Sequence, residues 1–148
     1  MANETLKASM LEFHRRFKGV AKEGRNPVFS SRYMTLDGIL DTVRPILADV
    51  DCYVTQDVTH VNMNEDSRIT SIQIRTEISH LTDTQVLSNY VSIPVLKPDA
   101  HGVGGALTYG RRYGLCLLLA ISADEDLDGN ENSGATMPVQ ERKLQPIR

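Results

Sequence analysis

Cysteine is scarce in this chain of 148 residues, with only Cys52 and Cys116. Two cysteines in apolar surroundings cannot form the disulfide framework of a small secreted domain, so they favour a reducing compartment. Long apolar runs are also absent, because none approaches the roughly 20 residues that cross a bilayer. We therefore expect a cytoplasmic protein with no membrane partner, and the length suits one domain with a tail.

The patterns that carry catalysis or hold cofactors are absent as well. The four histidines have no metal-ligand spacing, and no nucleophile lies near a base in a recognisable arrangement. The glycine-rich stretch 102–105 lacks the Gly-Lys-Ser/Thr end of a phosphate-binding loop, and Leu107 stands where a dinucleotide fingerprint needs its third glycine. The acidic run from Asp124 begins like a calcium loop, but Ala135 replaces the bidentate glutamate. We expect no enzyme, no catalytic residue, no metal and no cofactor.

Charge is segregated along the chain. Residues 1–32 carry a balance of +4, residues 33–123 a balance of −4 and residues 124–148 a balance of −3, so the net charge of −3 equals that of the tail. Where charge is segregated, net charge is a poor guide to partners, and the basic N-terminal end suits a polyanion. The composition predicts a folded core over residues 1–123 and an acidic, disordered tail over residues 124–148.

Hydrophobic periodicity predicts three helices, over residues 4–18, 36–48 and 103–120. Thr35 is a suitable N-cap for the second helix, and Pro45 is expected to kink or end that helix near Arg44. The third helix has a small residue at every fourth position, which lets its backbone lie close to a neighbour, most simply a sheet. These small residues are Ala106, Gly110 and Gly114.

Three strands are expected between the second and third helices, over residues 52–59, 68–79 and 84–93. The middle segment alternates Ile72, Ile74, Thr76 and Ile78 with polar residues, a period of two. The linkers are short, so an antiparallel meander is the economical arrangement. The sequence predicts an α+β fold in which a three-stranded antiparallel β-meander is packed by a following helix, a β-β-β-α core, with two N-terminal helices.

Two clusters have side chains suited to single-stranded nucleic acid, in which rings stack on bases and cations hold phosphates. The first lies on the third helix, where Arg111 and Arg112 stand between Tyr109 and Tyr113. A helical wheel sets Arg111 nearer the packing face, which makes Arg112 the expected direct contact. The second cluster occupies the basic N-terminal end and comprises Lys18, Lys22, Arg25, Arg32 and Tyr33.

Both clusters also have a structural explanation. Tyrosines of a half-buried helix often pack, and its arginines often pair with acids of a sheet. On the pattern alone we favour that explanation for the third helix. For the N-terminal cluster, a solvated loop explains any single residue better than it explains the group.

The third helix also carries a family resemblance. Its segment 104–115, GGALTYGRRYGL, followed by LLAI at 118–121 and the acidic run, resembles the signature of the ERF (essential recombination function) family of phage-type single-strand annealing proteins. VAKEGRN at 20–26 and FSSRY at 29–33 resemble two further motifs of that family, so the resemblance spans about residues 5–130. Gly105, Gly110 and Gly114 stand where the family usually has Ser, Ala and Ala. Because Gly costs about 1 kcal/mol against Ala inside a helix, we expect close approach at these positions.

The resemblance implies ATP-independent binding of single-stranded DNA and annealing of complementary strands in phage-type homologous recombination, in the cytoplasm of a bacterial host cell. It also implies assembly into a homo-oligomer, as a ring or filament, and a host single-strand-binding protein is a candidate partner. The family is thought similar in fold to the eukaryotic ring-forming annealing proteins. A basic pair that faces DNA in those relatives corresponds to Arg111 and Arg112, which outweighs the structural explanation.

Two other classes of function stay open at this point. One is a metal-dependent nuclease that uses the acidic run. The other is an interaction protein that does not bind DNA and whose basic residues serve protein contacts.

Overall fold

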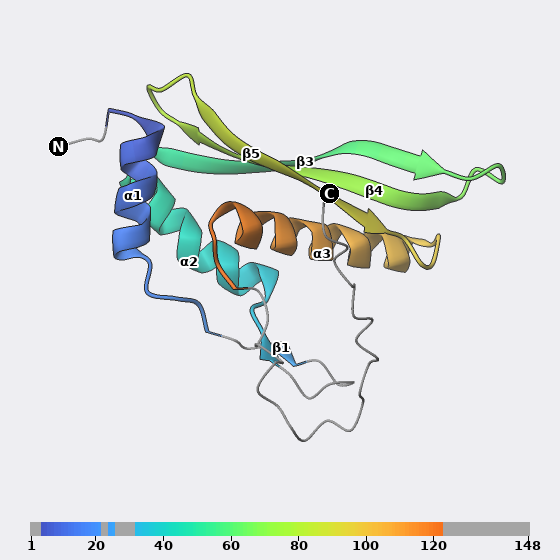
Figure 1. The fold of residues 1–148 in the computed structure, drawn as a ribbon. Coiled ribbons are helices and arrows are strands. Elements are labelled where there is room, and N and C mark those ends of the chain that lie inside the picture. The colour runs from blue at the N-terminus through green and yellow to red at the C-terminus, as the bar shows by residue number, and fades with distance from the viewer. Residues whose placement is uncertain (1–3, 22–23, 26–31, 123–148) are drawn as a thin grey trace, which may run out of the picture.

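The computed structural model describes residues 4–21, 24–25 and 32–122, along which three helices and five strands follow one another (Figure 1). The helices are α1 (Leu6–Arg16), α2 (Leu36–Asp49) and α3 (Ala100–Leu118). The strands are β1 (Gly24–Arg25), β2 (Arg32–Tyr33), β3 (Cys52–Met63), β4 (Ile69–His80) and β5 (Val86–Pro94). Across these residues, no helix combines the length and apolarity of a membrane span.

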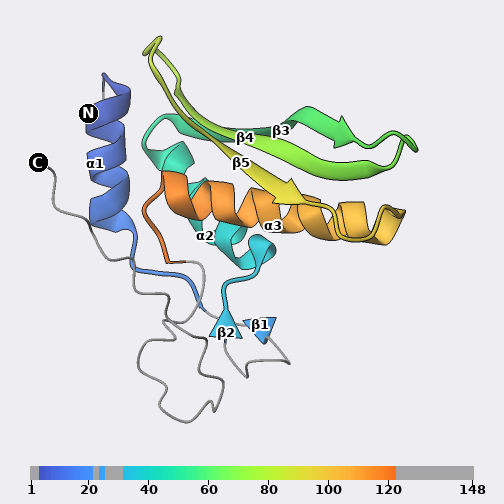
Figure 2. The same cartoon turned by 45° about the vertical axis from the view of Figure 1, so that its right-hand side comes forward.

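Strands β3, β4 and β5 form an antiparallel meander with β4 in the centre. Every second residue of β4 from Ile72 to His80 is buried, and the residues between them are partly exposed. The buried face is the one that the helices cover, and none of the described helices covers the other face, which we call the open face (Figure 2). The predicted α+β fold, with its β-β-β-α core and two N-terminal helices, is confirmed.

Helix α3 lies close to the sheet because two glycines face it. A Cβ atom at Gly110 would clash with Cδ1 of Ile74, and one at Gly114 would clash with Oγ1 of Thr76. The expected close approach is therefore confirmed at these two positions. At Gly105 it is wrong, because a Cβ there would meet no atom within 4 Å.

Side chains from both flanking strands fix the position of α3 along the sheet. The Gln56 amide of β3 donates to the carbonyl oxygen of Arg111 at 2.9 Å, and the Asn89 amide of β5 donates to the carbonyl oxygen of Gly114 at 2.9 Å. A half-buried hydrogen bond of this kind stabilises by about 1 kcal/mol. The two bonds set which residues of α3 lie over which strand.

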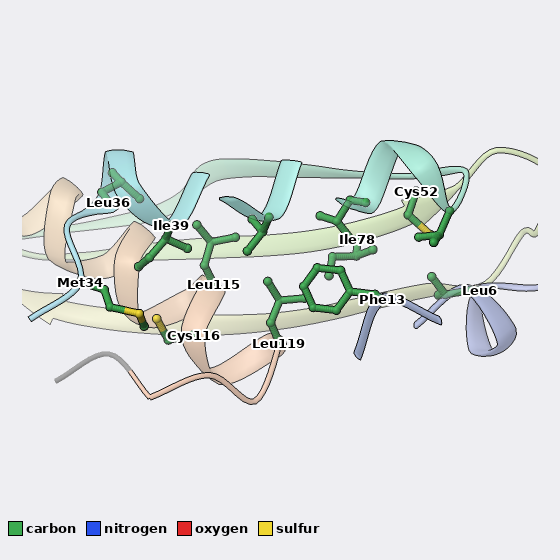
Figure 3. Packing of buried hydrophobic residues seen from close by; sticks show 13 residues of the cluster. Leu6, Phe13, Met34, Leu36, Ile39, Cys52, Ile78, Leu115, Cys116 and Leu119 are labelled. Carbon is green, nitrogen blue, oxygen red and sulfur yellow. The ribbon is translucent and has the colours of Figure 1, made fainter. Parts of the chain in front are cut away.

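The main core lies where α1, α2, the second half of α3 and one end of the sheet meet (Figure 3). Phe13, Ile39, Ile78 and Leu115 are fully buried there, one from each of these elements. A smaller cluster lies under the first half of α3 and comprises Ile72, Ile74, Val95 and Ala106.

Local chemistry sets the ends of the helices. Thr5, Thr35 and Asp99 cap α1, α2 and α3, each accepting a hydrogen bond from the backbone N–H three residues ahead. Helix α3 thus begins at Ala100, earlier than the predicted residue 103. Helix α2 continues through Pro45 to Asp49, close to the predicted end at residue 48, so of the two effects expected of Pro45 the ending of the helix near Arg44 is wrong. Pro45 and Asp41, whose carbonyl loses its donor, are both exposed, so water can replace the missing bond.

Candidate nucleic-acid interface

Arg112 of α3 lies among three tyrosine rings. Its guanidinium carbon is 4.5 Å from the centroid of the Tyr33 ring and 5.1 Å from the centroids of the Tyr109 and Tyr113 rings. The rings of Tyr109 and Tyr113 stack with their centroids 6.1 Å apart, and Nη2 of Arg112 lies 3.5 Å from the Tyr113 hydroxyl. A desolvated cation over an aromatic face is worth about 2 kcal/mol. The guanidinium therefore fixes the positions of the three rings.

Tyr33 reaches this cluster through the short strand pair β1–β2. Gly24 pairs with Tyr33 in the antiparallel register, and a Cβ atom at Gly24 would clash with the Tyr33 ring. The sequence predicts a loop over residues 19–28, and the two-residue strand β1 lies within it. This pairing joins part of the predicted N-terminal cluster to the cluster on α3.

The two arginines differ in burial, in the opposite order to the one expected from the helical wheel. Arg112 is only 6% exposed, whereas Arg111 is intermediate. The expectation assumed that α3 packs on the sheet alone. The side of α3 turned away from the sheet is packed too, because Tyr33 covers Arg112 there and Cys116, one turn later, belongs to the main core.

Arg111 is oriented by Gln56 of β3. Its Nε donates to Oε1 of Gln56 at 3.2 Å, while the Gln56 amide donates to Oγ1 of Thr76 and to the carbonyl oxygen of Arg111, both at 2.9 Å. Within the described part of the chain, no acidic side chain forms an ion pair with Arg111. A neutral amide thus orients this guanidinium without cancelling its charge.

A groove of about 770 Å³ lies between the N-terminal ends of α2 and α3, and we call it the α2–α3 groove. Tyr33, Tyr109, Arg111 and Arg112 all line it. Gly104 and Gly105 form part of its wall, and a Cβ atom at either would meet nothing within 4 Å. The groove therefore combines cationic groups, an exposed Tyr109 ring and a stretch of bare backbone that a ligand can approach closely.

The remaining predicted site residues stand apart from this groove or outside the described residues. Lys18 is exposed just after α1, and its Nζ donates to the carbonyl oxygen of Arg15 at 3.2 Å. Arg25 and Arg32 are placed by their backbones in β1 and β2, and their side chains lie outside the description. Lys22 and the whole tail, residues 124–148, also lie outside it. Where side chains are described, no three potential metal ligands come together.

Gln56 is the member of the site that the sequence interpretation missed. It falls on the inward-facing alternate of β3, after Cys52 and Val54, which the register places opposite buried residues of β4. A polar residue at a core-facing position of a strand needs a hydrogen-bond partner. That mismatch between position and polarity is the signal that could have identified it.

The whole chain can be compared with known protein families. The family profile of the ERF superfamily matches residues 6–146, nearly the full length. The chain therefore belongs to the ERF superfamily, as the motifs on α3 and at the N-terminal end indicated. Membership makes it a phage-type recombination and annealing protein in general, with nucleic acid as its general class of partner. No match was found among curated proteins or among solved structures.

Proposed function

We propose that this protein binds single-stranded DNA in the α2–α3 groove and anneals complementary strands without ATP. The observation that carries the proposal is the groove itself, in which Arg111 and the exposed ring of Tyr109 line one wall. A guanidinium group holds phosphate, and an aromatic ring stacks on any base. The expected consequence is binding that does not depend on sequence.

Annealing on such a surface needs no bond to be made or broken. Neutralised phosphates repel an incoming strand less, so a complementary strand can approach. A base that stacks on Tyr109 by its face keeps its pairing edge accessible to that second strand. Arg112 acts here as a positioning residue, because it is enclosed by the rings that it orients.

The N-terminal basic residues Lys18, Lys22, Arg25 and Arg32 belong to the proposal as a second side of the site. Strand β2 supports this role, because the strand that brings Tyr33 to the groove also contains Arg32. Reversing the charges of Lys22 and Arg25 should weaken binding and leave the number of subunits unchanged.

Assembly into a homo-oligomer, as a ring or filament, is also proposed. In the sheet, β3 and β5 are edge strands, and β5 has no charged residue from Val86 to Pro94. Val86, Leu87 and Tyr90 of β5 are exposed. A long uncharged edge is a template for pairing with another chain, and repeated subunits multiply weak contacts along one DNA strand. A host single-strand-binding protein is a further proposed partner.

The test is annealing of complementary oligonucleotides without ATP, with and without Mg²⁺, alongside the mass of the protein in solution. We expect annealing faster than the spontaneous reaction, strands of unchanged length, and a mass of several subunits. Shortened strands in Mg²⁺ would instead support a nuclease. Absence of oligonucleotide binding at low salt would overturn the proposal in favour of a protein-interaction role.

A further inference from the structure

We propose that the bound strand continues beyond the α2–α3 groove along the junction of α2 and β3, where Arg44 holds a second phosphate. This inference rests on the proposed function and extends its site to a residue that no motif indicates. We call the junction the α2–β3 track and define it by Leu40, Arg44, Tyr53, Val54, Gln56 and Arg111.

The track consists of two cavities that share an arginine in their linings. One cavity of about 220 Å³ is lined by Leu40, Arg44, Val54, Gln56 and Arg111. A second cavity, also about 220 Å³, is lined by Arg44, Leu47, Ala48, Cys52, Tyr53 and Val54. Arg111 lines both the α2–α3 groove and the first cavity, and Arg44 lines both cavities. The hollows therefore follow one another from Tyr109 to Tyr53.

The charge along the track favours a polyanion. Among the described residues that line the two cavities, none is acidic and two are arginines. The ion pairs in the described parts of the chain involve Arg15, Arg16 and Arg75, so neither Arg44 nor Arg111 is neutralised in that way. Arg44 is exposed on α2, where its guanidinium is accessible to a phosphate.

The remaining walls suit the sugar and base of a single strand. Leu40 and Val54 are half-buried apolar residues of the first cavity. Tyr53 lies between the inward-facing residues Cys52 and Val54, so its 55% exposed ring is on the open-face alternate of β3. The track thus continues the cationic chemistry of the α2–α3 groove without adding a stacking ring.

The experiment compares R44E with a matched control on the full-length chain. R68E makes the same change of charge at an exposed arginine beside the β3–β4 turn. Affinity is measured for a dT oligomer of about 6 nucleotides and for one of about 16, lengths within the range of single-strand sites.

We expect R44E to weaken binding of the longer oligomer about tenfold, the effect of one lost charge-assisted contact. R44E should bind the shorter oligomer within about twofold of the wild type. R44E should also reduce the log–log salt slope by about 0.7. R44Q, which removes the charge without reversing it, should show the same pattern at smaller size.

The outcomes separate the two proposals. If the wild-type protein binds neither oligomer at low salt, both the proposed function and the α2–β3 track are wrong. If the wild type binds, but R44E and R44Q lose no more affinity for the longer oligomer than R68E, the α2–α3 groove stands and the track is wrong. A thermal melt of each variant identifies any loss of affinity that comes from unfolding. If R44E is unfolded, the affinity of R44Q for the longer oligomer decides whether the track is correct.

Discussion

On the open face of the sheet Tyr90 lies opposite Arg75 in the register of β4 and β5, and on the helix side Tyr109 lies beside Arg112 on α3. The two tyrosines are exposed to similar extents, 58% and 51%. Their surroundings differ, because Arg75 forms an ion pair with Glu77 and has Asp57 opposite it on β3. On the helix side, Arg111 is held by the neutral amide of Gln56. A tyrosine beside an arginine is therefore not enough for a nucleic-acid site, because the charge must also be kept available.

The largest effect on stability should follow from disrupting the close packing of α3 against the sheet. In Gly114→Val, the added side chain meets the fully buried Thr76, which Gln56 fixes by a hydrogen bond. Such overpacking costs about 3 kcal/mol, the upper part of the usual range. We expect urea denaturation to show a much lower free energy of unfolding. Gly105→Val is the control, and it should change stability by less than about 0.5 kcal/mol because nothing lies near that position. Equal effects of the two variants would contradict the packing described for α3.

Arg112→Lys should produce the next largest effect. Lysine keeps the charge but cannot place a planar guanidinium among the rings of Tyr33, Tyr109 and Tyr113. We expect a loss of about 1–2 kcal/mol in the free energy of unfolding. Arg111→Lys, at the more accessible neighbour, should cost less than about 0.5 kcal/mol. The assignment of Arg112 as the positioning residue would be wrong if Arg111→Lys destabilised the protein more.

The comparison between the two faces can be tested by removing one arginine from each. Arg111→Gln should weaken binding of a dT oligomer about tenfold, which corresponds to about 1.4 kcal/mol, and reduce the log–log salt slope by about 0.7. Arg75→Gln on the open face should change affinity by less than about twofold, because Glu77 already balances that charge. Fluorescence anisotropy at several salt concentrations measures both quantities. A similar loss in both variants would remove the distinction between the faces.

The smallest expected effect is an increase in affinity. Asp37 is the acidic residue among the described lining of the α2–α3 groove. Asp37→Asn should strengthen binding about twofold, because it removes the salt-screened repulsion between one surface carboxylate and a phosphate. Asp41→Asn, one turn later on α2 and not in the described lining of that groove, is the matched control and should leave affinity unchanged. Equal changes in the two variants would show that only net charge matters.

The regular parts of the fold were predictable because their patterns are local. The alternation of apolar and polar residues along β4 predicted its buried face, and Thr35 predicted the start of α2. The end of β3 was not predictable in this way. The strand continues to Met63, past the predicted Thr59, and its register shifts between Val58 and His60 and again between Asn62 and Met63. Bulges of this kind interrupt the period of two on which the prediction depended.

The site was predictable in its composition but not in its geometry. Tyr109, Arg111, Arg112 and Tyr33 could be proposed from motifs, and the structure brings them to one groove. The order of burial of the two arginines depends on a second packed side of α3, which a helical wheel does not contain. Arg44 adjoins this site only because α2 packs beside β3, a tertiary contact with no signal in the local sequence.

Photochemical cross-linking tests the central claim, that the helix side and not the open face holds the DNA. A dT oligomer containing 4-thiothymidine is irradiated with the full-length protein, and the labelled residues are identified by mass spectrometry. We predict adducts at Tyr109 and in the peptides of the α2–α3 groove, with little or none at Tyr90, although Tyr90 is the more exposed of the two rings. Labelling of Tyr90 equal to or greater than that of Tyr109 would contradict the account.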